Sequence, residues 1–506
     1  MDRSELSAVI VHEAAELLAE ELHRIVCELM QHDLDTMERA LQQVSRRVFG
    51  QVLSNLVRMK GEDVARPVVC PTCTGPLRLI GNRRTKHRRG LVGDLILQRA
   101  TYVCTVCHQG HSPLDTELGM GSWGLTPGLA RVAALAGITD AFADAAALLQ
   151  EMRGVQLSTE HLRTLSEAMG AVAEAEQQEG IVAVRAGHLH ESAAGSETLL
   201  VEVDGVHVPE IDGWHEMKIV RAAPLGPQRR TDPQTGRTSL CLGASICGGG
   251  VEGAEPFWAR VQRVALQAGL GDRTRRVVVL CDGALWIWAR ATSFLCGPQR
   301  EVIEIVDIFH AYEHLWAVGH ALYPDERVCR RWVETLKDAL YTQGAAAVLD
   351  ALTAATPQTA EARDLVQVTQ DYFVSNAARM DYPRFVAAEL PIGSGAIESL
   401  CKNLVEERAK GAGMRWTEAG VQRIISLRAL HRSGQWTSFW ARHPLTGYAR
   451  RWPRKQRPYA LASAHTPHSD PSAEAPPVVT PPERPVPHPP HPSPWRRGPG
   501  VLPRCA

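Results

Sequence analysis

The sequence predicts a multidomain α/β protein whose mixed sheet is interrupted by an all-α insertion. Three observations indicate this fold class. At 506 residues with 44% hydrophobic content, the chain can bury more than one core. Two strand-like runs end in Asp-Gly pairs, at Asp204 and Asp282. A long stretch with helical periodicity then separates Asp282 from a third acidic motif around Glu398.

The region 196–310 contains β-branched and alternating runs that predict strands. We expect them at 198–204, 216–222, 238–246, 277–282 and 302–307, with a helix at 255–268 before the fourth strand. Three adjacent strands, then helix and strand, is the order of a ribonuclease-H-like sheet. The expected divisions are therefore a first part of this core at 196–310, an α-helical insertion at 311–388 and a second part at 389–450.

Other regions flank this core. Residues 1–62 show the spacing of two or three helices, which we interpret as a packing or dimerisation element. Residues 121–190 are also helical, and Gly154 followed by an expected N-cap at Ser158 is similar to the second half of a helix-turn-helix. Such a helix pair either reads DNA or serves only as a packing unit. Residues 459–506, rich in proline, serine and histidine, predict a disordered tail.

Two Cys-x-x-Cys pairs define a separate element at 65–120. Cys70-Pro-Thr-Cys73 precedes a basic alternating stretch, and Cys104-Thr-Val-Cys107 follows it. This spacing predicts a zinc ribbon in which four thiolates bind one Zn²⁺. A redox pair or unrelated core cysteines are the competing interpretations.

The formal net charge of −1 gives no global attraction to nucleic acid, so any DNA contact must come from local basic patches. One basic run lies between the cysteine pairs, where it forms either a solvated loop or a phosphate-contacting edge, and another follows Glu398. The residues expected to contact DNA are Arg83, Arg84, Lys86, Arg88, Arg89, Lys402, Arg408, Lys410 and Arg415. The sequence shows no membrane-spanning apolar run and no signal peptide, which predicts a cytoplasmic location.

Asp204, Asp282 and Glu398 form the candidate catalytic set. Asp204 and Asp282 are expected to be exposed at strand ends, and Glu398 in the first turn of a helix. Carboxylates that converge from separate elements can hold two Mg²⁺ (or Mn²⁺) ions for an in-line phosphodiester displacement. The alternative for each single Asp-Gly pair is an ordinary turn.

Several motifs together resemble one family. They are Pro391-Ile-Gly-Ser-Gly-Ala-Ile-Glu398-Ser, Asp307-Ile-Phe-His310, Gly413-Met-Arg-Trp416 and the Pro113-Leu-Asp-Thr-Glu-Leu-Gly sequence after the cysteines. These motifs resemble the transposases of the Kra-type bacterial insertion sequences, within the mutator-like group of DDE transposases. The resemblance covers roughly residues 65–445.

This resemblance implies that Asp204, Asp282 and Glu398 are the metal-binding triad of a ribonuclease-H-like domain. It places Asp307 and His310 near that site as auxiliary residues, although Asp307 can also simply cap the helix that carries His310. The implied partners are double-stranded DNA, as terminal inverted repeats and target, and further copies of the chain in a homodimer or larger oligomer. The implied location is the bacterial cytoplasm, at the nucleoid when DNA is bound.

Two other function classes compete with a transposase. One is a catalytically silent DNA-binding protein that uses the zinc ribbon and the helix-turn-helix-like region. The other is a structure-specific nuclease of ribonuclease-H type that cleaves without strand transfer. The intact acidic triad disfavours the first, and the insertion between Asp282 and Glu398 disfavours a minimal nuclease.

Overall fold

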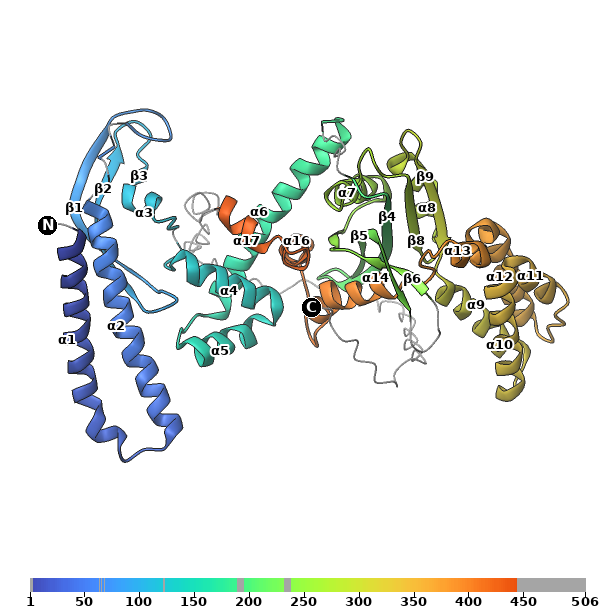
Figure 1. Ribbon diagram of the computed structural model, residues 1–506, viewed down its shortest axis with the longest axis horizontal. Coiled ribbons are helices and arrows are strands. Elements are labelled where there is room, and N and C mark those ends of the chain that lie inside the picture. The colour runs from blue at the N-terminus through green and yellow to red at the C-terminus, as the bar shows by residue number, and fades with distance from the viewer. Residues whose placement is uncertain are drawn as a thin grey trace, which may run out of the picture. The chain divides into compact units, whose positions relative to one another are not determined.

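The computed structural model describes residues 3–443, apart from 63, 65, 68, 122, 189–194 and 232–237 (Figure 1). The expected tail at 459–506 and the end of the 389–450 region lie outside these residues. The described chain is mixed α/β, with a three-stranded sheet, a six-stranded sheet and helices packed on both. None of its helices combines the length and low charge needed to cross a bilayer.

The amino-terminal part consists of two long helices and a small sheet. Helices α1 (Arg3–Leu29) and α2 (Leu34–Glu62) pack together, as expected, and α2 also contacts β2. Strands β1 (Leu77–Arg88), β2 (Leu95–Cys104) and β3 (Gly110–His111) are antiparallel in the order β1-β2-β3, followed by α3 (Pro113–Glu117). The basic run between the cysteine pairs is therefore an edge strand rather than a loop.

Three helices follow: α4 (Pro127–Thr139), α5 (Phe142–Arg153) and α6 (Thr159–Arg185). Helix α5 ends at Gly154, whose φ of 60° is left-handed, and the Ser158 hydroxyl accepts a hydrogen bond from the His161 amide at 3.1 Å. The N-cap expected at Ser158 is thus confirmed. Helix α6 then packs closely on α16 (Glu418–Arg432), where a Cβ at Gly170 would approach the Arg423 carbonyl to 2.4 Å.

The larger sheet contains β4 (Thr198–Pro209), β5 (Trp214–Thr231), β6 (Thr238–Leu242), β7 (Ile246–Gly250), β8 (Arg276–Cys281) and β9 (Glu301–Val306). Its order is β6-β5-β4-β8-β9, with β7 also paired to β5. Strands β4, β8 and β9 are parallel, whereas β5 is antiparallel to β4, β6 and β7. Helices α7 (Ala254–Gln267) and α8 (Leu285–Leu295) connect the later strands.

Three expected strand boundaries were wrong, and one of them is β5, which runs to Thr231 rather than ending at 222. Strand β4 does not end at Asp204 but continues to Pro209, because β5 pairs with it along its whole length, including Asp204 with Ile219. The single strand expected at 238–246 is two strands, since β6 pairs with the far end of β5 and β7 with its middle. The other two differences come from long-range pairing with β5.

Alternate residues of β5 belong to two different cores. Val220 and Ala222 pack in the core that includes α7 and α8, while Met217 and Ile219 pack in the core that includes α4, α6 and α16. Both faces of the sheet are therefore covered by helices. The helical region 121–190 shares this second core with the carboxyl-terminal helices, so it packs as part of the larger body.

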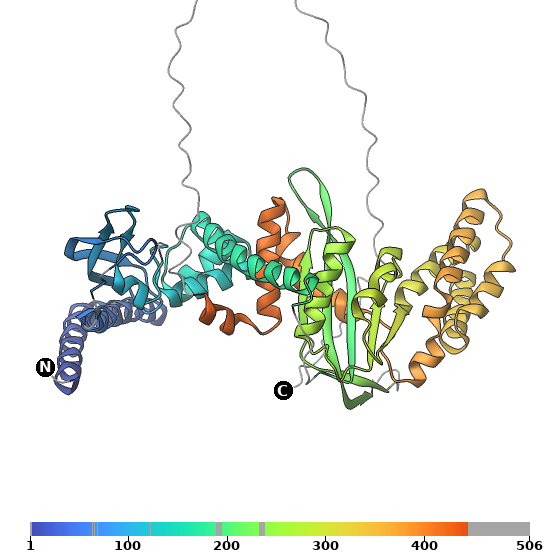
Figure 2. The ribbon, with the colours of Figure 1, turned by 90° about the horizontal axis from the view of Figure 1, so that it is seen from above.

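The insertion is all-helical, as expected, although it begins at Ile308 rather than 311 (Figures 1 and 2). It contains α9 (Ile308–Leu322), α10 (Glu326–Gln343), α11 (Ala345–Thr353), α12 (Ala360–Asn376), a 3₁₀ turn (Ala377–Met380) and α13 (Tyr382–Ala387). After it come α14 (Gly395–Leu400), a π-helical turn (Cys401–Glu406), α15 (Glu407–Ala409), α16 and α17 (Trp436–Arg442).

Two residues expected to contact DNA are internal. Arg88 is 4% exposed and donates to the Gly121 carbonyl at 3.1 Å. Arg408 is 1% exposed, donates twice to the Gly137 carbonyl at 3.1 and 3.0 Å, and lies over the Phe142 and Trp416 rings. The Gly137 carbonyl belongs to the last turn of α4, where carbonyls lack helical partners, so Arg408 caps that helix.

We predict that Arg408→Met lowers the free energy of unfolding by about 1–3 kcal/mol, because the Gly137 carbonyl is left buried without a donor. Urea unfolding followed by circular dichroism measures this change. Arg415→Met is the control, since Arg415 is exposed and should leave the midpoint unchanged. An Arg408→Met protein with unchanged stability would contradict the capping role.

Candidate active site

Asp204 and Asp282 lie at the same level of neighbouring parallel strands. The last pair between β4 and β8 is Glu202 with Leu280, and each aspartate comes two residues later on its strand. Asp282 accepts a hydrogen bond from the Ala284 amide at 3.0 Å, and Gly283 between them has a φ of 103°. Both aspartates are half-buried rather than exposed. The pairing of β4 with β8 ends before both aspartates, so the side chains of Asp204 and Asp282 can approach the same ligand.

Glu398 faces Asp204 across a cleft. It lies in the first turn of α14, as expected, and is exposed. The cleft has a volume of about 590 Å³. Asp204 and Glu398 line it together with Lys402, Glu406 and Lys410, and Asp282 is not among the lining residues. Two of the three expected carboxylates therefore open into one cleft beside two lysines, while the third, Asp282, directly follows β8.

Charge repulsion is evident at Asp204. Burial raises the pKa of this carboxyl, and the neighbouring Asp282 and Glu398 carboxylates raise it further. Hydrogen bonds from the Gly205 amide, at 2.7 Å, and from the Cys401 thiol, at 3.4 Å, act in the opposite direction. Two neighbouring carboxylates that raise the pKa of a third form a site that favours a cation.

The donor set fits hard divalent ions, which prefer carboxylate oxygens. Within the described residues, the three carboxylates do not all come within 4.8 Å of one another, as ligands of a single ion would. A two-ion site does not require this, because the two ions lie roughly 3.5–4 Å apart and each takes its own subset of ligands. Glu202, the neighbouring acid on β4, is instead buried in an ion pair with Arg221.

Asp307 links the insertion to the helix of Glu398. Its carboxylate caps α9 by accepting from the Phe309 and His310 amides at 3.2 and 3.3 Å. It also accepts from the Ser394 amide at 3.1 Å and the Ser394 hydroxyl at 2.8 Å. At 3% exposure, with both oxygens engaged, Asp307 is a positioning residue here rather than a metal ligand.

Ser394 is shared by two carboxylates. Its hydroxyl oxygen lies 2.8 Å from Asp307 and 2.9 Å from Glu398, yet it carries a single proton. It can therefore donate fully to only one of them at a time. Because Asp307 is buried and Glu398 is exposed, Glu398 is the partner that can turn away toward the cleft.

His310 lies on the Asp282 side of this region. Its ring is 6.2 Å from Tyr372, whose hydroxyl donates to the Asp282 carbonyl at 3.1 Å. His310 also pairs with Glu313 at 3.3 Å. His314 stacks on Tyr372 at 4.0 Å, and burial together with the charge of His310 lowers its pKa to about 4. His314 is thus an uncharged packing group, and His310 is the more accessible histidine.

Sequence reasoning missed three contributors to this site. They are Ser394, Tyr372 and the π-helical turn that begins at Cys401. π-helical turns are rare and frequently occur at functional sites. A signal existed for Ser394 and Cys401, since they lie four residues before and three residues after Glu398 on one helical run. Tyr372 is ninety positions from its partner Asp282, and no local pattern connects them.

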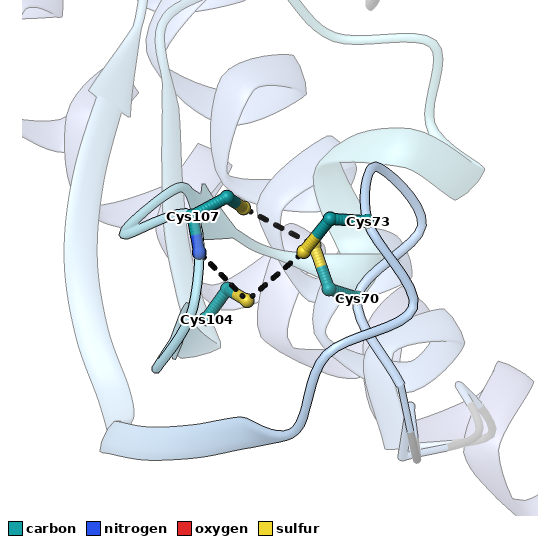
Figure 3. A group of neighbouring side chains, drawn as sticks. All are labelled: Cys70, Cys73, Cys104 and Cys107. Atoms are coloured by element: carbon teal, nitrogen blue, oxygen red, sulfur yellow. Dashed lines mark hydrogen bonds between the residues drawn. The ribbon is translucent and has the colours of Figure 1, made fainter.

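The four cysteines form a second candidate metal site (Figure 3). Their sulfur atoms all lie within 4.8 Å of one another, with Cys70 3.6 Å from Cys107 and Cys73 3.4 Å from Cys104. A tetrahedron with Zn–S bonds of about 2.3 Å places sulfurs roughly 3.8 Å apart. The amides of Val106 and Cys107 donate to the Cys104 sulfur, and the Cys107 amide bond is the main cause of its lowered pKa. The expected cluster is therefore present and could bind zinc.

His111 adds to the cysteine cluster from β3. Its Nε2 lies 3.2 Å from the Cys70 sulfur, a contact that the spacing of the cysteines does not reveal. A ring N–H directed at a thiolate stabilises the charged form of that ligand. His111 is thus a neighbour of the cluster that orients one ligand.

The remaining basic residues differ in accessibility. Arg83, Arg84 and Arg89 are exposed on or next to the β1 edge, whereas Lys86 is half-buried and 4.0 Å from Asp115. In the cleft, Lys402 is exposed and Lys410 pairs with Glu406 at 2.8 Å, while Arg415 is exposed outside it. Arg89 also donates to the Gln156 carbonyl, so Arg83, Arg84, Lys402 and Arg415 are the expected DNA contacts that are exposed and for which no such bond is described.

Comparison with known proteins adds no relative. No protein-family model and no curated protein sequence matches the chain. The residues and their geometry therefore carry the functional conclusion.

We predict that the cysteine cluster of the purified protein holds one zinc ion, because four thiols already lie at near-tetrahedral spacing. Metal analysis measures the ion, and alkylation with mass spectrometry should show all four cysteines protected until a strong chelator is added. Cys104→Ser should lose the ion, while Cys329→Ser, a buried cysteine of α10, should keep it. A metal-free protein with freely alkylated thiols would contradict the prediction.

Ser394→Ala should destabilise the protein by about 1–3 kcal/mol, since the buried Asp307 carboxylate loses a hydroxyl donor. Chemical denaturation measures the loss. Ser399→Ala is a matched control, because Ser399 is an exposed serine next to Glu398. Equal stability of the two variants would show that the Ser394 hydroxyl does not hold Asp307.

Asp204→Asn should raise the melting temperature at neutral pH without added Mg²⁺. The pKa of Asp204 is higher in the folded protein than in the unfolded chain. The stability that this carboxyl contributes therefore declines as pH rises from the pKa of the unfolded chain through the pKa of the folded protein. Above that window the ionised form is a net cost, which the amide removes. Near pH 3, where the carboxyl is protonated in both states, the difference should vanish; a stabilisation that persists there would contradict this origin.

Proposed function

We propose that the chain is a DDE-type transposase that binds the terminal inverted repeats of a bacterial insertion sequence and catalyses metal-dependent strand cleavage and strand transfer. The observation that carries this proposal is the arrangement of Asp204 and Glu398 beside Lys402 and Lys410 in one cleft, with Asp282 at the end of the adjacent parallel strand. Carboxylates for metal and lysines for phosphate are the two requirements of phosphoryl transfer.

The sheet topology supports a ribonuclease-H-like core. Strands β4, β5 and β7 are antiparallel neighbours in chain order, and β8 and β9 are added on the other side of β4 and parallel to it. The acidic residues lie on β4, directly after β8 and on a helix after the sheet. An all-helical insertion separates the last two, as the family resemblance implies.

The chain's own residues would act as follows. Asp204, Asp282 and Glu398 would hold two Mg²⁺ or Mn²⁺ ions, which when bound activate the attacking hydroxyl and stabilise the departing 3′-oxygen. The Cys401 thiol, held at 3.4 Å, fixes the orientation of Asp204. Lys402 and Lys410 lie on the same helical run as Glu398 and would contact the phosphates flanking the scissile bond.

Other parts of the chain would position the DNA. The exposed arginines of the β1 edge, in the zinc ribbon, supply a second phosphate-contacting surface. Synapsis of two transposon ends requires at least two copies of the chain, so a homodimer or larger oligomer belongs to the proposal. The reaction would take place on DNA in the bacterial cytoplasm.

Glu398→Gln tests the proposal. A labelled duplex carrying the inverted repeat that flanks the gene is incubated with protein, target DNA and Mg²⁺ or Mn²⁺. The intact protein should nick the repeat end and join it to the target, and Glu398→Gln should lose both activities by at least a hundredfold because one metal ligand loses its charge. Glu407→Gln is the matched control, since Glu407 is exposed on the same helical run but does not line the cleft.

The same assay separates the competing functions. Tight, sequence-specific binding without cleavage by the intact protein would favour a DNA-binding protein. Cleavage of branched or hybrid duplexes without joining would favour a structure-specific nuclease. Cleavage that Glu398→Gln does not reduce would contradict the assignment of the catalytic triad.

A further inference from the structure

The hairpin between β4 and β5 carries a cluster of ligand-type side chains outside the cleft. Glu210, Asp212 and His215 each place one ligand atom within 4.8 Å of the other two. Glu210 and Asp212 lie in the loop beyond the last strand pair, Pro209 with Trp214, and His215 follows Trp214 on β5. Neither the acidic triad nor the zinc ribbon includes them.

Glu210 is the residue whose environment indicates a bound ligand. Its side chain is only 4% exposed, and its Oε1 has no hydrogen-bond partner in the described part of the chain. A buried carboxylate oxygen without a partner is costly, because it has lost its water and gained nothing in return. A cation bound by this oxygen would remove that cost.

The backbone holds the three side chains together. The Glu210 amide donates to the Gly213 carbonyl at 2.7 Å, and Gly213 has a φ of 153°, at the edge of the range that favours glycine. This tight turn brings Asp212 back over Glu210. His215 then places its Nε2 3.1 Å from an Asp212 oxygen. Asp212 and the ring of His215 are partly exposed, so solvent can complete a coordination shell.

The donor chemistry selects the ion. One imidazole nitrogen with two carboxylates suits Zn²⁺ and related first-row ions, whereas Mg²⁺ prefers oxygen ligands alone. We propose that Glu210, Asp212 and His215 bind one transition-metal ion of the Zn²⁺ class, distinct from the ions of the cysteine cluster and of the Asp204 cleft.

Such an ion would brace two segments of the site. The Ile211 amide donates to the Trp416 carbonyl at 2.9 Å, and the Trp416 amide donates to the Pro209 carbonyl at 3.1 Å. The hairpin thus extends β4, which carries Asp204, and contacts the segment that follows the Glu398 helix. An ion at its tip fixes the hairpin that makes these two bonds.

Cobalt binding tests the site in the full-length protein with zinc already in the ribbon. Asp204→Asn is introduced throughout, so that the catalytic cleft cannot account for binding. In a titration, one equivalent of Co²⁺ should bind and give the visible absorption bands of nitrogen and oxygen ligands. The sulfur-to-cobalt charge-transfer bands that would appear if Co²⁺ replaced the zinc of the ribbon should be absent. His215→Ala and Asp212→Asn should each weaken binding at least tenfold. Both positions are partly exposed, so both variants are expected to fold.

His207→Ala is the matched control, because His207 is an exposed histidine of the same hairpin that lines the cleft instead. Unchanged binding in this variant is expected. Failure to bind this one equivalent of Co²⁺, or binding insensitive to both His215→Ala and Asp212→Asn, would overturn the proposal. A loss that follows His207→Ala would assign the ion to the cleft and overturn it equally. None of these results depends on transposase activity.

Discussion

The site depends on the buried carboxylate of Asp307. The chain leaves the sheet at this residue, forms the whole helical insertion, and returns to the same point, where the Ile308 amide donates to the Ile392 carbonyl at 2.9 Å and Ser394 donates twice to Asp307. The Asp307 amide is itself bound to the Cys281 carbonyl at 2.7 Å, one residue before Asp282. Asp307 therefore joins β8 through its amide, and the insertion and the start of the Glu398 helix through its carboxylate. Because its four acceptor positions are filled by donors, its burial is tolerated.

The acidic residues of this region fall into two groups, those that are fully bonded and those that are not. Asp307 and Glu202 are buried and fully engaged, by Ser394 and by Arg221 respectively, so they fix the geometry. Asp204 and Glu398 are left with partial hydrogen bonding and with one another's charge, which costs stability in the absence of a cation. Proteins commonly accept such local costs at functional sites and recover them elsewhere. The Asp-x-x-His element of the sequence thus has two roles, since Asp307 positions the helices and only His310 remains accessible.

The sequence predicted those features that depend on local patterns. The Ser158 cap, the helical insertion, the cysteine cluster and the place of Glu398 in the first turn of its helix all follow from spacing within a few residues. Prediction from the sequence failed where contacts between distant segments determine the local structure. Asp204 lies within β4 because β5 pairs beyond it, and Arg408 is buried because the end of α4, some 270 positions earlier, needs a cap. Charge alone does not distinguish an arginine that caps a helix from one that binds phosphate.

The burial of Arg88 and Arg408 also changes the expected electrostatics of DNA binding. In the proposed function, a chain with a net charge of −1 would contact DNA through local groups of exposed cations, and two of those expected donate instead to internal carbonyls. The accessible ones lie in two places, on the β1 edge of the ribbon and beside Glu398. Each phosphate contact contributes separately to the salt dependence of affinity, so a few contacts at each place give weak binding singly. The proposed function would therefore need both places to contact one DNA for strong binding. The cleft, which holds carboxylates, would gain affinity for phosphate chiefly when cations neutralise them.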